Sequence, residues 1–177
     1  SKKVININGE TFSDWDELDN NKIDEIKQKC NKYLPKLFEL HNIHKYLDGG
    51  FTENTKIELQ DGHNVNINEI EVNDVLRFGE RVIGIVKIKA DDLETKQIMI
   101  DKRNSIQGGP NLQICDPDLG MMSILDMYGE RIKVKYVYHL ITDKKTFHIN
   151  GVRYYDYNSC IDKYLDLENN KLVKALV

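Results

Sequence analysis

The residues of this chain best suited to covalent chemistry are three cysteines, Cys30, Cys115 and Cys160. A thiol is a nucleophile near neutral pH and leaves easily, so cysteine serves both acyl transfer and metal binding. The three lie far apart in sequence and none belongs to a CxxC pair, which argues against a zinc site or a disulfide framework. We therefore expect a reducing compartment, the cytoplasm, and a buried position for Cys160 on a C-terminal helix.

Two further groups have the residue types of metal ligands but not the spacing. His41 and His44 stand three residues apart, as on one helix face, but no other ligand lies near them in sequence. The Asp91-Asp92 pair and the residues Asp116 and Asp118 do not follow a calcium-loop pattern and are interpreted as turns. The sequence predicts no metal and no cofactor.

Size, charge and hydropathy limit the other possibilities. The chain has 177 residues and 20.6 kDa, with 40% apolar and 31% charged residues, which suits one domain or a compact domain with an extension. A net charge of -4 and a pI of about 5.7 disfavour a nucleic-acid binder. No apolar run is long enough to span a bilayer. We expect a monomer that binds neither nucleic acid nor membrane.

The first fifty residues have the pattern of a strand followed by helices. Residues 3–8 alternate apolar and polar side chains, as a short strand does. Ser13 and Asp16 have the spacing of a helix-capping box, and apolar residues then recur at helical spacing from 23 to 47. Asp48-Gly49-Gly50 is a typical helix stop.

After Gly50 the pattern changes to β. Runs with alternating apolar residues are separated by turn signals, and Asp61-Gly62 and Asn150-Gly151 are typical of hairpin turns. Gly108-Gly109-Pro110 and Asp116-Pro117-Asp118 are interpreted as strand breakers. The expected strands cover 56–59, 81–88, 98–100, 132–142 and 146–155, and a short amphipathic helix is expected within 159–177.

One string of residues resembles the first motif of Hint domains, the self-cleaving modules of hedgehog proteins and inteins. That motif has a cysteine, then Phe, small or polar residues, Thr, any residue and Ile or Val, and it ends at a Gly-Asp pair before an apolar residue. Phe51, Thr55, Ile57 and Asp74 match this order, while Asn73 takes the place of the glycine.

A second string, Tyr138 to Thr142, resembles the Hint motif in which a strand histidine precedes apolar residues. His139 is that histidine, and Tyr136 takes the place of the usual upstream threonine. A histidine in an apolar strand is more often a core residue than a catalyst, so both interpretations stay open for His139. His148 is a weaker rival for the same role.

The residues from Phe147 onward, with Asn150-Gly151, resemble the last motif. Tyr155 stands there for the histidine of inteins and Asp156 for their terminal asparagine, while a second register puts Asn158 at that terminal position. In inteins this asparagine cyclises onto its own carbonyl and cuts the second junction. Both candidates also fit ordinary loop positions.

The resemblance implies a mainly β fold: a Hint-type horseshoe of strands and hairpins with an N-terminal helical extension and a short C-terminal helix. It also implies three parts. These are a flanking segment over 1–49, a Hint-like domain over 50–158 and a flanking helix over 159–177.

The resemblance further implies chemistry on the chain's own backbone. In Hint domains a cysteine thiol attacks the carbonyl of the preceding residue, which gives a thioester that a second nucleophile resolves. Carried over to this sequence, the nucleophile position is Gly50, and His139 would protonate the departing nitrogen. Thr55 and Asp74 would position groups or polarise the carbonyl.

Gly50 has no side chain, so the resemblance implies that this N-to-S acyl shift is inactive here. Either glycine replaced a cysteine to keep a self-cleaving protein intact, or the copy is naturally inactive. We favour replacement, because the chain continues past both junctions. The expected substrate is the flanking polypeptide in cis, and splicing, cleavage and adduct transfer all stay open.

The rival hypothesis is a non-catalytic β-rich module that binds a partner or supports a larger assembly. The two hypotheses differ in geometry. Self-processing requires the Gly49–Gly50 bond, His139 and the chain near Asp156 to meet, whereas a binding module leaves those three points scattered.

Overall fold

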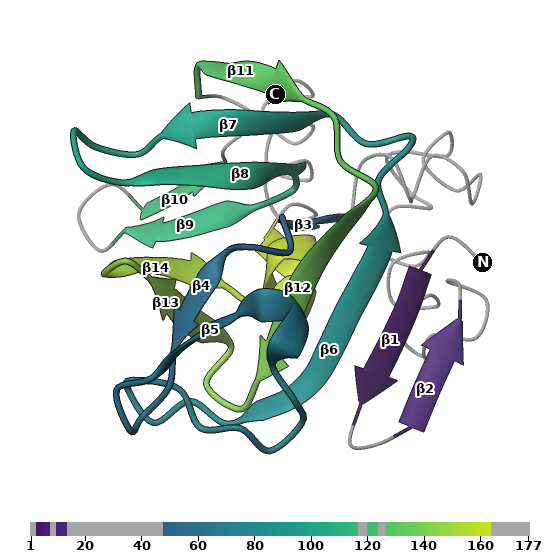
Figure 1. Cartoon of the computed structure of the whole chain (residues 1–177), viewed down its shortest axis with the longest axis vertical. Helices are drawn as coiled ribbons and strands as arrows, with labels where there is room; N and C mark the ends of the chain where they lie inside the picture. Colours follow the sequence, from purple (N-terminus) through teal and green to yellow (C-terminus); the bar gives the residue numbers. More distant parts are fainter. Residues whose placement is uncertain (1–2, 8–9, 14–47, 117–119, 124–126, 164–177) are drawn as a thin grey trace, which may run out of the picture.

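The chain is mainly β in a computed structural model that describes residues 3–7, 10–13, 48–116, 120–123 and 127–163 (Figure 1). The strands within these ranges are β1 (Lys3–Ile7), β2 (Glu10–Ser13), β3 (Gly49–Phe51), β4 (Lys56–Glu58), β5 (Asn64–Asn66), β6 (Val82–Lys89), β7 (Thr95–Met99), β8 (Ser105–Pro110), β9 (Gln113–Asp116), β10 (Gly120–Ser123), β11 (Gly129–Ile132), β12 (Tyr136–Thr142), β13 (Thr146–Ile149) and β14 (Val152–Tyr155). One 3-10 turn (Ile67–Glu69) follows β5, and residues 157–163 form a helix after β14.

The described strands form three antiparallel sheets. The largest has the order β11-β7-β8-β3-β12-β6-β1-β2, the second β10-β9-β14-β13, and the third is the hairpin β4-β5. β6 and β12 are the longest neighbours and pair from Tyr136↔Lys89 to Leu140↔Ile85, with a bulge between Ile141 and Thr142. Figure 1 shows them side by side, with β1 and β2 extending the sheet beyond β6.

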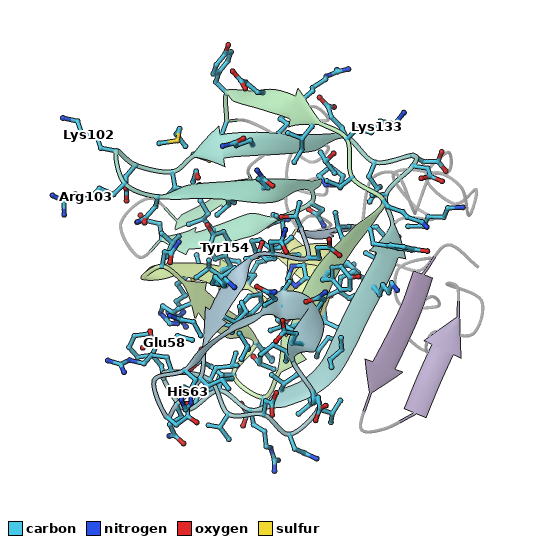
Figure 2. The ribbon with its side chains drawn as sticks, in the orientation of Figure 1. Glu58, His63, Lys102, Arg103, Lys133 and Tyr154 are labelled. Carbon is cyan, nitrogen blue, oxygen red and sulfur yellow. The ribbon has the colours of Figure 1, made fainter. Side chains whose placement is uncertain are left out.

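The core lies where the larger sheets and the β4-β5 hairpin face one another. Phe51, Phe147 and Tyr154 are fully buried there, and the Phe51 ring meets the other two edge-on at centroid distances of 5.9 Å and 5.2 Å. Edge-to-face packing is the preferred arrangement of aromatic pairs. Tyr154 occupies the middle of the molecule in Figure 2, whereas Glu58 and His63 project from its rim.

Turn residues place the strands as their sequence predicts. Asp61-Gly62 joins β4 to β5, and Asn150-Gly151 joins β13 to β14, with φ of +50° and +77° at the last two residues. Asn73 has a φ of +78°, a conformation that asparagine tolerates better than most residues, which accounts for its place where the Hint motif has glycine.

Most expected strands are confirmed, but one expected breaker is wrong. Gly108-Gly109-Pro110 belongs to β8 and pairs with β3. Glycine is needed because a Cβ at Gly108 would collide with the Gly50 carbonyl oxygen and one at Gly109 with the Glu94 carbonyl oxygen. Proline is accepted because it ends the strand. Ser13, expected in a capping box, ends strand β2 instead. Asp16 and the helices expected between 23 and 47 lie outside the described residues, as does the tail beyond 163.

Among the residues that the structure describes, no helix is long and apolar enough to cross a membrane.

The central packing of Phe51 predicts a large stability effect. Phe51→Ala should lower the free energy of unfolding by about 3–5 kcal/mol, the usual result of emptying a buried phenylalanine site. Urea unfolding measures it. Phe78→Ala is the matched control: that ring is 56% exposed, so its loss should change the free energy by less than about 1 kcal/mol. Equal effects of the two changes would contradict this account of the core.

Candidate functional site: the meeting of the two junctions

Strand β3 carries the first proposed junction into the middle of the largest sheet. It lies between β8 and β12, with Gly50 opposite Gly109 and Phe51 opposite Tyr138. All three of its residues are buried. The Gly49–Gly50 bond is therefore held in the β structure and not in an exposed loop.

The backbone around Gly50 leaves little room for a side chain. A Cβ added at Gly50 would lie 2.8 Å from the Tyr138 carbonyl oxygen and 2.9 Å from the Tyr138 nitrogen. A Cβ at Gly49 would lie 2.7 Å from the Asn111 nitrogen, and one at Gly108 would collide with the Gly50 carbonyl oxygen. Because these neighbours are backbone atoms, a larger residue requires the strands to move apart.

His139 lies directly beside this strand and is only 1% exposed. Its ring contacts the rings of Phe51 and Tyr157 at centroid distances of 5.5 Å and 5.9 Å. The Leu140 N–H donates to His139 Nδ1 at 2.9 Å, closer than the Leu140 carbonyl oxygen at 3.3 Å, so Nδ1 is the unprotonated nitrogen. His139 Nε2 then carries the hydrogen and faces Cys160 Sγ at 3.8 Å.

Burial changes what His139 can do. Removal from water lowers the pKa of His139 to about 3, because the low-dielectric interior disfavours the charged ring. The ring is therefore neutral near pH 7, and a neutral imidazole is a much weaker acid than imidazolium. The geometry places His139 at the junction, but its protonation state does not suit it to donate a proton.

The second proposed junction meets the first through a buried hydrogen bond. The Tyr157 hydroxyl donates to Asp48 Oδ1 at 2.5 Å, and both residues are almost fully buried. Burial raises the pKa of Tyr157 well above its usual value, and the negative charge of Asp48 adds to the shift. Asp48 directly precedes Gly49, and Tyr157 directly follows Asp156. The two ends of the proposed Hint-like region therefore touch.

Asp156 is engaged in helix capping. Its Oδ1 accepts the Ser159 N–H at 2.9 Å, the pattern of an N-cap at the start of helix 157–163, and its Oδ2 accepts the Thr142 N–H at 3.1 Å. Burial raises the pKa of Asp156, while these two hydrogen bonds oppose the shift. Asn158, the other candidate for the terminal position, lies half-buried in the first turn of the same helix.

Cys160 is the one described thiol that faces His139. It is 2% exposed, and Sγ donates to the Tyr155 carbonyl oxygen at 3.4 Å. Burial strongly raises the pKa of Cys160, and the charge of Asp156 raises it further, so the thiol is protonated and unreactive near neutral pH. The expectation that Cys160 is a buried helix residue is confirmed.

Thr55 and Asp74 make local contacts instead. Thr55 lines a cavity of about 410 Å³ with Ser105, Gln107 and Asn150, and its carbonyl accepts the Ile67 N–H. Asp74 closes a turn, because its Oδ2 accepts the Glu71 N–H at 2.8 Å. The structure thus places His139 beside β3 and links Asp48, before Gly49, to Tyr157, after Asp156. Thr55 and Asp74 have other neighbours.

Three contributors to the site escaped the sequence analysis. Asp48 was interpreted only as part of a helix stop, Tyr157 had no motif, and Gln113 fell in a stretch without clear pattern. Gln113 Nε2 donates to Asn111 Oδ1 at 2.7 Å and to the Cys160 carbonyl at 3.0 Å. The second bond connects β9 to the helix over residues 157–163. Only the position of Asp48 and Tyr157 next to the two junctions could have marked them.

Among the described residues no three His, Cys, Asp or Glu side chains gather as metal ligands would.

No known protein family and no curated protein matches this sequence. Solved structures do. The gp41-1 intein is similar with a TM-score of 0.51 and 15% identity, over 62% of this chain and 99% of the intein. A DnaB intein from Synechocystis sp. PCC 6803 has a TM-score of 0.46 and 14% identity over 62% of this chain and 99% of its own. An intein from a hyperthermophile has a TM-score of 0.42 and 12% identity over 62% of this chain and 100% of the intein.

At 15% identity the first of these likenesses speaks for the fold alone. It agrees with the mainly β architecture that the sequence predicts. The β body of this chain therefore has the Hint fold of inteins.

Proposed function

We propose that this chain is an intein-like self-processing domain that is inactive at its first junction and keeps both flanking segments attached. The observation that carries the proposal is the buried Tyr157–Asp48 hydrogen bond, which joins the residue after Asp156 to the residue before Gly49. Splicing or cleavage in cis needs both junctions in one place. A binding module has no reason to bring them together.

The same site lacks what the acyl shift requires. Gly50 offers no nucleophile, and the thiol of Cys160 is buried and protonated. His139 is neutral and hydrogen-bonded to the backbone, so it cannot readily protonate a departing nitrogen. The N-to-S shift therefore lacks both a nucleophile at position 50 and a general acid.

The upstream segment is also built into the sheet. Strand β1 pairs with β6 over five residues, from Lys3↔Ile88 to Ile7↔Gly84. Because each pair contributes to the ladder, β1 gains stability from staying in place. We therefore propose that β1 and the helix over residues 157–163 remain parts of one folded unit with the β body.

The crowding at Gly50 indicates that this backbone is suited to glycine. It argues against the hypothesis that glycine replaced a cysteine here. This observation supports a second candidate function, a non-catalytic β-rich module that holds or presents its flanks. Cleavage after a thiol is supplied at position 50 would exclude this second candidate, whereas an intact chain is expected of both.

Restoring the thiol tests this directly. The wild type, Gly50→Cys and Gly50→Ala are incubated for several hours with and without a small thiol, and intact mass is measured. We expect all three to stay whole, because the Cβ crowds the Tyr138 backbone and His139 is neutral. Both variants should lose about 1–3 kcal/mol of unfolding free energy, the usual effect of overpacking.

Gly50→Ala is the matched control, since it adds the same Cβ without sulfur. Loss of the first 49 residues from Gly50→Cys but not from Gly50→Ala would mean that glycine is the single defect of an otherwise working site. Adding His139→Ala to Gly50→Cys would then show whether His139 takes part. Loss of residues 1–49 from the wild type would contradict the proposal itself.

Buried His139 predicts a pH dependence of stability. Its folded pKa of about 3 lies below the usual value of 6.5, so the unfolded chain binds more protons between those values. The free energy of unfolding should fall as pH decreases, by about 2 kcal/mol between pH 7 and pH 5 from this group. The measurement is urea unfolding at both pH values for the wild type and for His139→Leu.

The leucine variant should lose this share of the pH dependence, while His63→Gln, at an exposed histidine, should keep it. In the wild type the ring resonances of His139 should stay constant from pH 7 to pH 5. A ring that titrates in that range would show that His139 is accessible to protons and could serve as an acid.

A further inference from the structure

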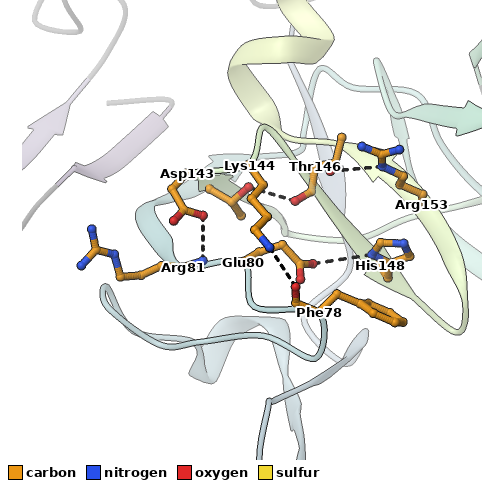
Figure 3. Close-up of polar contacts among 9 residues, drawn as sticks. Phe78, Glu80, Arg81, Asp143, Lys144, Thr146, His148 and Arg153 are labelled. Atoms are coloured by element: carbon orange, nitrogen blue, oxygen red, sulfur yellow. Dashed lines mark hydrogen bonds and ion pairs between the residues drawn. The ribbon is translucent and has the colours of Figure 1, made fainter.

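A buried carboxylate lies away from the residues that form the junction. The Glu80 side chain is 3% exposed, and neither of its oxygens has a hydrogen-bond partner within the described residues. The nearest cationic group is His148, whose Nδ1 lies 3.6 Å from Glu80 Oε2 (Figure 3). That nitrogen also has no hydrogen bond within the same ranges.

The loop that carries Glu80 is fixed in this position. The Arg81 N–H donates to Asp143 Oδ1 at 2.9 Å, and Lys144 Nζ donates to the Phe78 carbonyl at 3.0 Å (Figure 3). The Leu76 N–H donates to the Glu80 carbonyl. The backbone on both sides of Glu80 is thus fixed, with the carboxylate beside His148 on β13.

A carboxylate taken out of water needs either a proton or a positive partner. His148 is the available partner, and a positive His148 must carry a hydrogen on Nδ1, which points at Glu80. Both ring nitrogens are then donors. Because Glu80 engages Nδ1, the Nε2–H is left for another acceptor.

His148 opens onto a cavity. Its side chain is 26% exposed and lines a space of about 320 Å³, whose wall also includes Lys56, Arg77, Phe78 and Asn150. The Phe78 ring covers His148 at a centroid distance of 4.3 Å. Glu80 is not part of the wall, so a ligand in the cavity would meet His148 and not the carboxylate behind it.

The charges around this cavity favour an anion. Lys56, Arg77 and His148 supply positive charge, against the single carboxylate of Glu58, which pairs with Arg77 at 3.3 Å. Lys56 Nζ donates to Asn66 Oδ1 at 2.6 Å, so it is held at the wall.

We propose that this cavity, the His148 cavity, binds a small oxyanion, a carboxylate or a phosphate group. His148 Nε2–H, Lys56 and Arg77 bind it, and Glu80 acts as a positioning residue that holds the His148 ring through Nδ1. Charge-assisted hydrogen bonds of this kind are the strong ones. A space of about 320 Å³ is large enough for such a group on a small molecule.

The binding should depend on pH, because histidine is the side-chain type whose charge ordinarily changes between pH 5 and pH 8. Of the charged groups around His148, Glu80 lies behind its ring and Lys56, Glu58 and Arg77 line the same cavity. Arg153 lies opposite His148 on β14, and Lys144 donates to the Phe78 carbonyl. Oxyanion binding should therefore weaken between pH 6 and pH 8.

Titration of the full chain with inorganic phosphate and with acetate tests the proposal. Histidine ring and backbone resonances are followed by NMR at pH 6 and pH 8. We expect a saturable shift at His148 and Arg77 that is weaker at pH 8. Tighter binding of phosphate than of acetate identifies a phosphate site, and the reverse identifies a carboxylate site.

His63 is the internal control, because it pairs with Asp61 at 3.0 Å but is 81% exposed. A shift at His148 no larger than at His63 for both anions overturns the proposal, as does equal binding at the two pH values.

Two variants separate a positioning role of Glu80 from a general loss of structure. Glu80→Gln and His148→Gln should each weaken anion binding about tenfold, the result of losing a charged hydrogen-bond partner. Glu80→Gln should also flatten the pH profile, which a purely structural role would not do. Asp61→Asn, at the exposed pair, should leave binding unchanged. Wild-type affinity and pH profile in a folded Glu80→Gln overturn the role of Glu80; if it does not fold, the wild-type titration decides.

Discussion

The structure depends on the close passage of one three-residue strand between two others. β3 pairs with β8 on one side and β12 on the other, and the backbones lie so near that a Cβ at Gly50 would approach the Tyr138 backbone to 2.8 Å. Glycine alone allows this approach without moving the neighbours. The strand sets the place of Phe51 in the aromatic core, and it brings Asp48 within reach of Tyr157. The meeting of the two ends of the Hint fold is thus a consequence of backbone packing.

The same packing removes reactivity from the groups it assembles. His139, Cys160 and Asp156 lie at the junction, but burial lowers the pKa of the histidine to about 3 and raises those of the thiol and the carboxyl. A working acid or nucleophile needs the opposite: a histidine that can be charged and a thiol that can lose its proton. The fold brings these groups together under conditions that keep each of them neutral or engaged by the backbone. Proximity alone therefore does not give the site its chemistry.

Sequence reasoning predicted the parts of the fold that local chemistry determines. Asp61-Gly62 and Asn150-Gly151 specify hairpins because their residues accept positive φ, and the alternation from Val82 to Lys89 specifies a strand with one buried face. It misread Gly108-Gly109-Pro110, because glycine and proline break most strands. Glycine fits this strand because the backbones of Gly50 and Glu94 approach it closely. It also missed the Tyr157–Asp48 bond, since two residues 109 positions apart have no local signal of contact. The order of the motifs located the candidate site. The pKa shifts of its residues follow from burial, which the sequence does not show.

Two buried carboxylates show why hydrogen bonding, rather than burial, separates structural from functional acids in this domain. Asp156 accepts two backbone N–H groups, so its charge is compensated and its position is fixed by the helix it caps. Glu80 is equally inaccessible but accepts none within the described residues, and only His148 lies near enough to compensate it. A carboxylate whose charge is compensated by backbone N–H groups needs no other partner. A carboxylate that is compensated by a titratable side chain depends on the protonation of that side chain. The second arrangement places a histidine on the wall of a cavity, which gives the Glu80–His148 pair a stronger claim to a role in binding than the carboxylate at the junction.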